Sequence, residues 1–280
     1  MKKLEDKLNV ITVHCNPYHF KRRKFLSEQF REEMLKTIDV ELYIVELAYD
    51  DDPFEVTDKN NKNHLQLRTS SSNMLWEKEC LLNLGVKKLL PENWKAFAWV
   101  DGDVTFDRPD WASDALKILN GHRDIIQLFN VCLDLDKQGN TLTAFHSFAY
   151  QYETRQKYYR SNVNFSHTGF AWSCTRRFYD TYMKEISEFE ILGSSDYKCS
   201  IAFLNKDTLF YCGDHKQLLE DFKNRVKYAR IGYVPCLIVH HFHGSKQNRK
   251  YNTRYLELVK HKFNPKTMLQ GLLIPTNKFP

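Results

Sequence analysis

The stretch "KAFAWVDGDVTFDRP", Lys95–Pro109, places an apolar run directly before two aspartates that are separated by one glycine. The run "AFAWV" (96–100) is short, apolar and partly aromatic, which predicts a buried central strand. Residues two apart on a strand share a face, so Asp101 and Asp103 can converge where the chain leaves the sheet. Gly102 between them permits a sharp backbone path, because it carries no side chain.

Two neighbouring carboxylates in a partly desolvated position repel each other unless a pKa rises or a cation binds. In parallel α/β sheets, ligands bind beyond the carboxyl ends of the strands, which is where this pair is expected. Oxygen ligands of this kind suit a hard divalent ion, Mg²⁺ or Mn²⁺, that also grips a diphosphate. The alternative interpretation is an ordinary polar turn in which an aspartate caps the next element.

The front of the chain alternates between strand and helix patterns. Strands are expected at 8–16, 40–49 and 96–100, and helices at 20–38 and at 73–91, the second ending near Gly85. The polar stretch 50–72, broken by Pro53, is predicted to be a long connection. This alternation favours an α/β fold with a mixed, mostly parallel sheet flanked by helices.

The back of the chain is less regular. Strands are expected at 124–135 and 143–153 with a hairpin turn at Gly139-Asn140, followed by a helix at 176–186 and a late strand at 232–243. No linker separates front from back, so we expect one continuous domain with a front half, 1–107, and a back half, 108–280.

Composition narrows the class of protein. The 280 residues are 42% hydrophobic and 14% aromatic, enough for a substantial core in one large domain. Seven scattered cysteines without a CxxC pair indicate reduced thiols in a cytoplasmic protein rather than a disulfide scaffold or zinc ribbon. No apolar run approaches about 20 residues, so no membrane span is expected. The net charge of +6 favours acidic partners such as nucleotide phosphates or nucleic acid.

The segment "AWVDGDVTF" resembles the DxD motif of GT-A glycosyltransferases, whose Rossmann-like fold carries this motif on the corresponding strand. The chain resembles the small soluble enzymes of phage or bacterial type in this family, which would act in the cytoplasm, or in the host cytoplasm for a viral chain. It implies a nucleotide-sugar donor, UDP-linked, bound by the half 1–107, and an acceptor bound by the half 108–280. Asp101 would contact the ribose and the sugar, and Asp103 would hold Mn²⁺ or Mg²⁺ on the diphosphate.

The late segment "PCLIVHHFHGSKQNRKYNTRY" (235–255) resembles the region in which such enzymes supply a further metal ligand. We favour His243 for the metal and keep His240 and His241 as alternates; on a strand, His241 and His243 would share a face. Imidazole is a good ligand for Mn²⁺, although histidines satisfied by hydrogen bonds in a rim are the alternative. The resemblance also assigns three cations to the diphosphate: Lys246, Arg249 and Arg254.

Two segments between these motifs carry further candidates. In "NVNFSHTGFAWSCTRRFYD" (162–180), Gly169 and Trp172 would form part of the sugar pocket, unless Trp172 is a core residue. In "EILGSSDYKCS" (190–200), Asp196 would be the base that deprotonates the acceptor hydroxyl, or else a helix N-cap.

The front half offers weaker candidates, each of which could equally serve a surface or packing role. Asn16 and Glu46 stand at the ends of the first two strands, where they would meet the nucleobase and ribose. Arg68 would reach the diphosphate, and Trp76 and Asn83 would line the same wall.

Three basic-aromatic stretches, 19–25, 155–160 and 246–255, have the composition of a nucleic-acid groove. Combined with the resemblance, they imply as acceptor either a hydroxymethylated base in DNA, as in phage DNA-modifying glycosyltransferases, or a lipopolysaccharide or capsular saccharide. A non-catalytic nucleic-acid-binding module would also explain them. A metal-dependent nuclease or phosphatase fits less well, since no third carboxylate is evident near the two aspartates.

Overall fold

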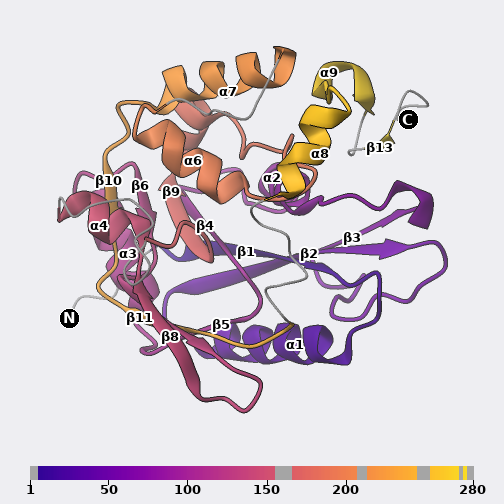
Figure 1. Cartoon of the computed structure of the whole chain (residues 1–280). Coiled ribbons are helices and arrows are strands. Elements are labelled where there is room, and N and C mark those ends of the chain that lie inside the picture. The colour runs from indigo at the N-terminus through magenta and orange to yellow at the C-terminus, as the bar shows by residue number, and fades with distance from the viewer. Residues whose placement is uncertain (1–5, 155–165, 207–212, 245–252, 271–273, 276–280) are drawn as a thin grey trace.

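The computed structural model describes residues 6–154, 166–206, 213–244, 253–270 and 274–275 (Figure 1). Its main feature is a seven-stranded sheet in the order β10-β6-β9-β4-β1-β2-β3. The strands are Leu8–Cys15 (β1), Val40–Tyr49 (β2), His64–Thr69 (β3), Ala96–Val100 (β4), Ile125–Gln127 (β6), Ala171–Thr175 (β9) and Ile231–Tyr233 (β10).

Only β9 runs antiparallel to its neighbours, β4 and β6, and every other pair in this sheet is parallel. The predicted mixed, mostly parallel α/β sheet is therefore confirmed. The helices around it are Lys21–Lys36 (α1), Lys78–Lys88 (α2), Trp111–Asn120 (α3), Phe148–Glu153 (α4), Arg176–Phe178 (α5), Ser195–Phe203 (α6), Gly213–Val226 (α7), Arg254–Lys260 (α8) and Pro265–Met268 (α9), with short helical turns at Ser71–Asn73 (η1) and Tyr179–Met183 (η2).

A second, four-stranded sheet has the order β5-β11-β7-β8. Its strands are Val104–Phe106 (β5), Val131–Leu135 (β7), Thr141–His146 (β8) and Leu237–His240 (β11), and a separate two-stranded pair joins Leu269–Gln270 (β12) to Ile274–Pro275 (β13). β5 follows the two aspartates directly and pairs antiparallel with β11, with His240 opposite Val104. This pairing brings the late histidine segment to Asp103.

The two faces of the main sheet bury separate cores because side chains alternate along each strand. On one face, Phe30 and Met34 of α1 pack with Val10 of β1. On the other, Leu81 of α2 packs with Ile11 of β1. In Figure 1 the two helices accordingly cover opposite sides of the sheet.

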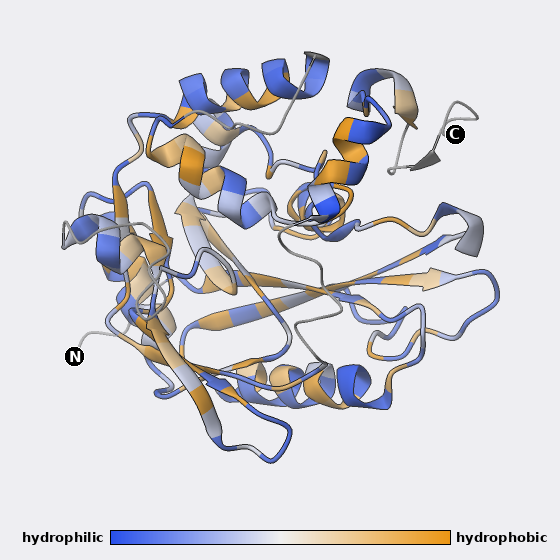
Figure 2. Cartoon of the chain, viewed as in Figure 1, coloured by the Kyte–Doolittle hydropathy of each residue, from blue (hydrophilic) through white to orange (hydrophobic). Residues whose placement is uncertain are grey.

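The outer helix α7 shows how a surface helix attaches to this core. Leu219, Phe222 and Val226 are buried and recur at helical spacing. Figure 2 shows the corresponding pattern, with hydrophilic residues on the outer side of α7 and hydrophobic residues along its inner edge. In the described part of the chain, no helix combines the length and apolar character needed to traverse a bilayer.

Helix α2 differs from the prediction that it would end near Gly85, since it continues to Lys88. Gly85 lies inside the helix because the helix touches the sheet there. A Cβ at this position would lie 3.0 Å from side-chain carbons of both Ile11 and Val45. The glycine is thus explained by close helix–sheet packing rather than by a helix end.

Several predicted boundaries were wrong because membership of a sheet is not a local property. The predicted connection 50–72 contains β3, an edge strand whose Leu65 and Leu67 pack against the core. The predicted strand 124–135 is two strands, β6 and β7, which belong to different sheets. A continuous apolar run does not reveal where the chain passes from one sheet to the other.

Three further predicted elements each correspond to two separate elements in the structure. The predicted strand 143–153 is β8 followed by α4, which Ser147 caps by accepting a hydrogen bond from the backbone N–H of Tyr150. The predicted helix 176–186 is the short α5 followed by the π-helical turn η2. The late strand 232–243 is interrupted near Pro235 into β10 and β11. Helices α3 and α7 had no counterpart in the prediction, whereas the hairpin turn at Gly139 was confirmed between β7 and β8.

Candidate metal and donor site

The two aspartates lie in the short loop between β4 and β5, at the carboxyl end of the central strand. The backbone N–H of His241 donates to the carbonyl of Asp103 at 2.9 Å, so the chain after β11 remains beside this loop. Gly102 faces α1 and β1, since a Cβ there would lie 3.4 Å from the hydroxyl of Ser27 and 3.6 Å from that of Thr12. The loop is therefore packed against α1, β1 and the chain after β11.

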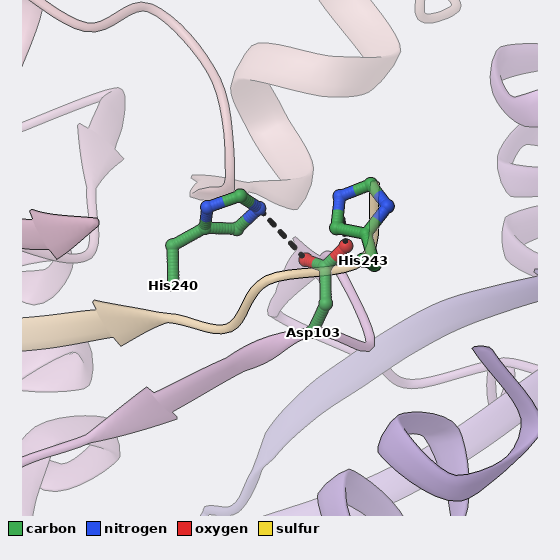
Figure 3. A group of neighbouring side chains, drawn as sticks. All are labelled: Asp103, His240 and His243. Atoms are coloured by element: carbon green, nitrogen blue, oxygen red, sulfur yellow. Dashed lines mark ion pairs between the residues drawn. The ribbon is translucent and has the colours of Figure 1, made fainter. Parts of the chain in front are cut away.

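Two of the three late histidines point at the carboxylate of Asp103 (Figure 3). Nε2 of His243 lies 3.1 Å from Oδ2, and Nε2 of His240 lies 3.9 Å from Oδ1. β11 ends at His240, and the chain then turns so that His243 returns to the same side. The expectation that His241 and His243 share a strand face was wrong, because the strand has already ended. The ring of His241 instead pairs with the Thr105 hydroxyl at 2.9 Å.

These side chains form a set that fits a divalent cation. One ligand atom from each of Asp103, His240 and His243 lies within 4.8 Å of the others. Oδ1 of Asp103 is buried and forms no hydrogen bond with the described residues. Burial favours a higher pKa for Asp103, but His240 and His243 hold this pKa below its ordinary value, so the carboxylate is charged. A carboxylate combined with two imidazoles suits Mn²⁺.

Asp101 has a different cationic partner. Lys78, in the first turn of α2, donates to Oδ1 of Asp101. Burial raises the pKa of Asp101, and the lysine opposes part of that rise. Burial lowers the pKa of Lys78, but the carboxylates of Asp101, Glu79 and Asp196 together outweigh burial and raise this pKa above its ordinary value. The backbone N–H of Asp101 donates to the carbonyl of Phe170 at 2.8 Å, which ties the loop to the start of β9.

Asp196 and Gly169 lie against each other beside this ion pair. Asp196 is in the first turn of α6, and the Thr168 hydroxyl donates to its Oδ2 at 3.3 Å. A Cβ on Gly169 would lie 2.5 Å from the same oxygen, so only glycine leaves room for the carboxylate. The charge of Asp196 acts on both Lys78 and Asp101. The structure therefore brings together Asp101, Asp103, Gly169, Asp196, His240 and His243.

Among the three predicted diphosphate-binding cations, Arg254 is described, whereas Lys246 and Arg249 lie outside the described residues. Arg254 begins α8, and its guanidinium donates to the hydroxyl of Ser194, directly before α6. A Cβ on Gly193 would lie 3.2 Å from this guanidinium. Arg254 thus adjoins the helix that carries Asp196.

The front-half candidates have structural partners. The side chain of Asn16 accepts from the backbone N–H of Phe20 at 3.0 Å and donates to Glu55 at 2.9 Å. Glu46 is 1% exposed, and its carboxylate accepts hydrogen bonds from the backbone N–H groups of residues 55–57. Glu46 therefore anchors a loop and does not present its carboxylate to a ligand, contrary to the ribose role predicted for it.

Arg68 and Trp172 lie in the surroundings that their alternative roles, at the surface and in the core, would give. Arg68 is on the edge strand β3, where it donates to the carbonyl of Asp50 and lies over the ring of Phe54. Trp172 is 3% exposed, and its indole N–H donates to the carbonyl of Thr168 at 2.8 Å. Its ring stacks with that of Trp99 inside the core, so the core interpretation of Trp172 is the one that the structure supports.

Trp76 and Asn83, which were predicted to line the wall of the diphosphate site, differ in exposure. Trp76 is 42% exposed at the edge of α2. Asn83 is buried and donates to the carbonyl of Ile186 at 2.8 Å, while its own side-chain oxygen accepts from the N–H of Ile186 at 2.9 Å. Asn83 therefore fastens α2 to the segment before α6 rather than lining a ligand wall.

Sequence reasoning missed two residues that contact the site, Lys78 and Asp134. A lysine at the N-terminus of a helix opposes the helix dipole, so its position already signals an external anionic partner. Asp134 lies in the apolar strand run "VCLDL" (131–135), where a buried carboxylate requires a partner. Neither signal identifies which residue that partner is.

No model of a known protein family matches the chain, and no curated protein matches its sequence. One similar solved structure is a Desulfovibrio desulfuricans G20 protein named as a nucleotide-diphospho-sugar transferase. The TM-score is 0.37 at 11% sequence identity, covering 92% of this chain and 96% of that chain. Another is the 1–349 fragment of S. aureus TarS, with a TM-score of 0.43 and 14% identity over 84% of this chain. This chain spans 60% of the TarS fragment.

Proposed function

We propose that the protein is a metal-dependent glycosyltransferase that moves a hexosyl or pentosyl group from a nucleotide sugar to an acceptor hydroxyl. The donor that we propose is UDP-linked. The observation that carries the proposal is the convergence of Asp103, His240 and His243 beyond the carboxyl end of β4, the edge at which α/β sheets bind ligands.

Asp103, His240 and His243 would hold Mn²⁺ or Mg²⁺, and imidazole ligands favour Mn²⁺. The bound ion would supply Lewis-acid stabilisation to the departing nucleoside diphosphate. Arg254, together with Lys246 and Arg249, would share the charge of that leaving group.

Two aspartates would carry out donor binding and proton transfer. Asp101, fixed by Lys78, would accept hydrogen bonds from donor hydroxyls. Asp196 would take the proton of the acceptor hydroxyl as it attacks the anomeric carbon, which is the role of a general base in an inverting reaction. Two observations support this role: the Thr168 hydroxyl holds the carboxylate, and Gly169 leaves a backbone surface without a side chain beside it.

Asn16 and Arg68 remain proposed contacts of the nucleotide, through the end of β1 and the edge strand β3. Glu46 and Trp172 are left out of the proposed donor site. The carboxylate of Glu46 is occupied by backbone N–H groups, and the indole of Trp172 is enclosed in the core.

For the acceptor we propose a hydroxymethylated base in DNA, and a saccharide hydroxyl is the alternative. Support comes from the first basic-aromatic stretch, at the start of α1. Arg22 in this stretch donates to the carbonyl of Phe242 at 3.3 Å, one residue before His243, so the surface adjoins the metal ligands. Exposed side chains on this stretch combine cations with aromatic rings, which suits stacking and phosphate contact: Phe20, Lys21, Arg22, Arg23, Lys24 and Phe25. The other two stretches, 155–160 and 246–255, lie outside the described residues except for 253–255.

The test is release of nucleoside diphosphate from a panel of nucleotide sugars, with Mn²⁺, with Mg²⁺ and with a chelator. We expect one donor to be turned over with metal, and Asp103→Ala to abolish this turnover. Asp110→Ala, an exposed aspartate on the same segment, is the matched control and should behave as wild type. A folded wild-type protein that is inert towards every donor would contradict the proposal and favour a nucleic-acid-binding module.

The acceptor is tested separately, by comparing sugar transfer to hydroxymethylcytosine DNA, unmodified DNA and oligosaccharides. We expect transfer only to the hydroxymethylated DNA, and a reduced rate for Phe20→Ala. Transfer to an oligosaccharide instead would uphold the chemistry and overturn the DNA acceptor.

A further inference from the structure

A second carboxylate, Asp134, contacts the other ring nitrogen of His240. Oδ1 of Asp134 lies 2.7 Å from Nδ1, whereas Nε2 of the same ring faces Asp103. Asp134 is on β7, which pairs parallel with β11, and the register sets it directly opposite His240. It is 2% exposed, so this contact is made inside the protein.

The chemistry of the contact determines how the imidazole is presented. An ionised carboxylate can only accept a hydrogen bond, so Nδ1 of His240 must carry the hydrogen and donate it. In the neutral ring, this leaves the lone pair on Nε2, directed towards Asp103. A short bond to an ionised acceptor is also stronger than a neutral one. Asp134 therefore selects the ring form that can bind a metal from the Asp103 side.

The plane of the His240 ring is fixed by a different group. The ring of Phe170 stacks on it, with centroids 4.6 Å apart and planes inclined by 27°. Phe170 has a φ of +75°, a backbone conformation that is costly for a bulky residue. Because its carbonyl also accepts from the N–H of Asp101, Phe170 couples the position of the imidazole to the aspartate loop.

We propose that Asp134 is a positioning residue of the metal centre, which orients His240 and sets its tautomer without touching metal or donor. The inference rests on the proposed function, because it assigns a role towards the metal held by Asp103, His240 and His243. Carboxylates behind ligating histidines are a general means of fixing the ring and increasing its basicity.

The first experiment measures Mn²⁺ affinity in the absence of donor, from the electron paramagnetic resonance signal of free Mn²⁺. Asp134→Ala should weaken binding by about 10- to 100-fold, and Asp134→Asn by less, since its amide oxygen still accepts the Nδ1 hydrogen. Thr143→Ala is the matched control, because Thr143 is the exposed cross-strand neighbour of Asp134 on β8. It should bind Mn²⁺ as wild type does.

A double-mutant cycle separates orientation of His240 from a general loss of structure. If Asp134 acts through His240, adding Asp134→Ala to His240→Ala should weaken Mn²⁺ binding no further. Additive losses would contradict the inference. Asp134 variants that are folded and bind Mn²⁺ as tightly as wild type would also overturn it, while leaving the proposed function intact provided that Asp103→Ala still abolishes binding.

The second experiment needs no metal. In ¹⁵N-histidine-labelled protein with neutral imidazoles, nuclear magnetic resonance should show the hydrogen of His240 on Nδ1, and Asp134→Ala should remove this preference. A hydrogen on Nε2 in the wild-type protein would overturn the inference. A wild-type protein that binds no Mn²⁺ would contradict the proposed function and this inference together.

Discussion

Asp101 and Asp103 are two residues apart, yet each faces a different side-chain partner. Lys78 pairs with Asp101, and His240 and His243 face Asp103. The repulsion expected between adjacent carboxylates is therefore divided between two partners. This division implies unequal roles, with Asp103 towards the metal and Asp101 towards the donor.

Asparagine substitutions test that inequality. Asp103→Asn should weaken Mn²⁺ binding by more than about 100-fold, because losing a ligand exceeds the 10- to 100-fold cost of losing its supporting groups. Asp101→Asn should leave Mn²⁺ affinity within about 3-fold of wild type, since its carboxylate is held by Lys78. Isothermal titration calorimetry measures both. Equal losses in the two variants would mean that the ion is shared between the aspartates.

Gly169 tests the proposed base. In Gly169→Ala the new Cβ would lie 2.5 Å from Oδ2 of Asp196, so the carboxylate has to move. A displacement of about 1 Å can reduce a rate roughly 100-fold, and we expect kcat for transfer to fall by about that factor. Mn²⁺ affinity should not change, because the atoms nearest to a Cβ on Gly169 belong to Asp196 and His167, not to the proposed metal ligands. An unchanged kcat would argue against Asp196 as the base.

Glu77 makes stability depend on pH. It is 5% exposed, and burial raises its pKa to about 7 from the ordinary 4.5. The folded protein thus holds this proton more tightly than the unfolded chain. The resulting stabilisation is fully present below pH 4.5 and is lost as pH rises through about 7.

Glu77→Gln removes this titration while keeping the shape of the side chain. The variant should match wild type in free energy of unfolding near pH 4 and exceed it at pH 8 by on the order of 1–3 kcal/mol. Urea unfolding at the two pH values measures the difference. If the free energies of unfolding of variant and wild type differ by the same amount at both pH values, ionisation of Glu77 is not coupled to folding.

At the scale of elements, the contact between α2 and the sheet depends on Gly85. Gly85→Val would force its side chain into Ile11 and Val45, which already lie 3.0 Å from the position of a Cβ. Overpacking of this kind costs about 1–3 kcal/mol, and chemical denaturation should show a loss in that range. Lys87→Val, on the exposed side of α2, is the control and should lose only the small difference in helix propensity. A loss in Gly85→Val no larger than that in Lys87→Val would contradict the packing explanation, because replacing glycine by valine by itself raises helix propensity.

The sequence predicted those helices and strands whose hydrophobic pattern is complete within one short segment of the chain. β4 matches the predicted 96–100, and α1 and β2 lie within a few residues of their expected bounds, because each has a clear period or apolar run. β3 was hidden in a polar stretch, where Leu65 and Leu67 gain their role only beside β2. The helix–sheet contact at Gly85 likewise depends on residues far away in the chain.

Prediction of the site from the sequence is limited in the same way, because contacts between distant residues are not visible in a local pattern. The motif around Asp103 and the cluster of late histidines indicated a metal centre, but not which histidines form it. That choice depends on the pairing of His240 with Val104 and on the turn after β11. The partnership of Lys78 with Asp101 is similarly non-local. Residue types indicated which side chains to consider, while strand register determines which of them converge.

For the molecule as a whole, the metal centre would join two distant parts of the chain, the loop before β5 and the end of β11. A ligand that binds only the folded state stabilises it, by about 2.7 kcal/mol at 100 times its Kd. Mn²⁺ at that excess should therefore raise Tm by roughly 5–10 °C. Thermal unfolding should show this shift in wild type and in His241→Ala, and lose it in His243→Ala. A shift that persists in His243→Ala would indicate binding elsewhere.

The central claim is that one divalent cation lies between the aspartate loop and the late histidines. Anomalous diffraction at the manganese edge, from crystals grown with Mn²⁺ and UDP, tests it most directly. The account predicts one strong peak within ligand distance, roughly 2–2.5 Å, of a carboxylate oxygen of Asp103 and of Nε2 of His240 and His243. A peak at another site, or none beside Asp103 in crystals that contain bound UDP, would contradict it.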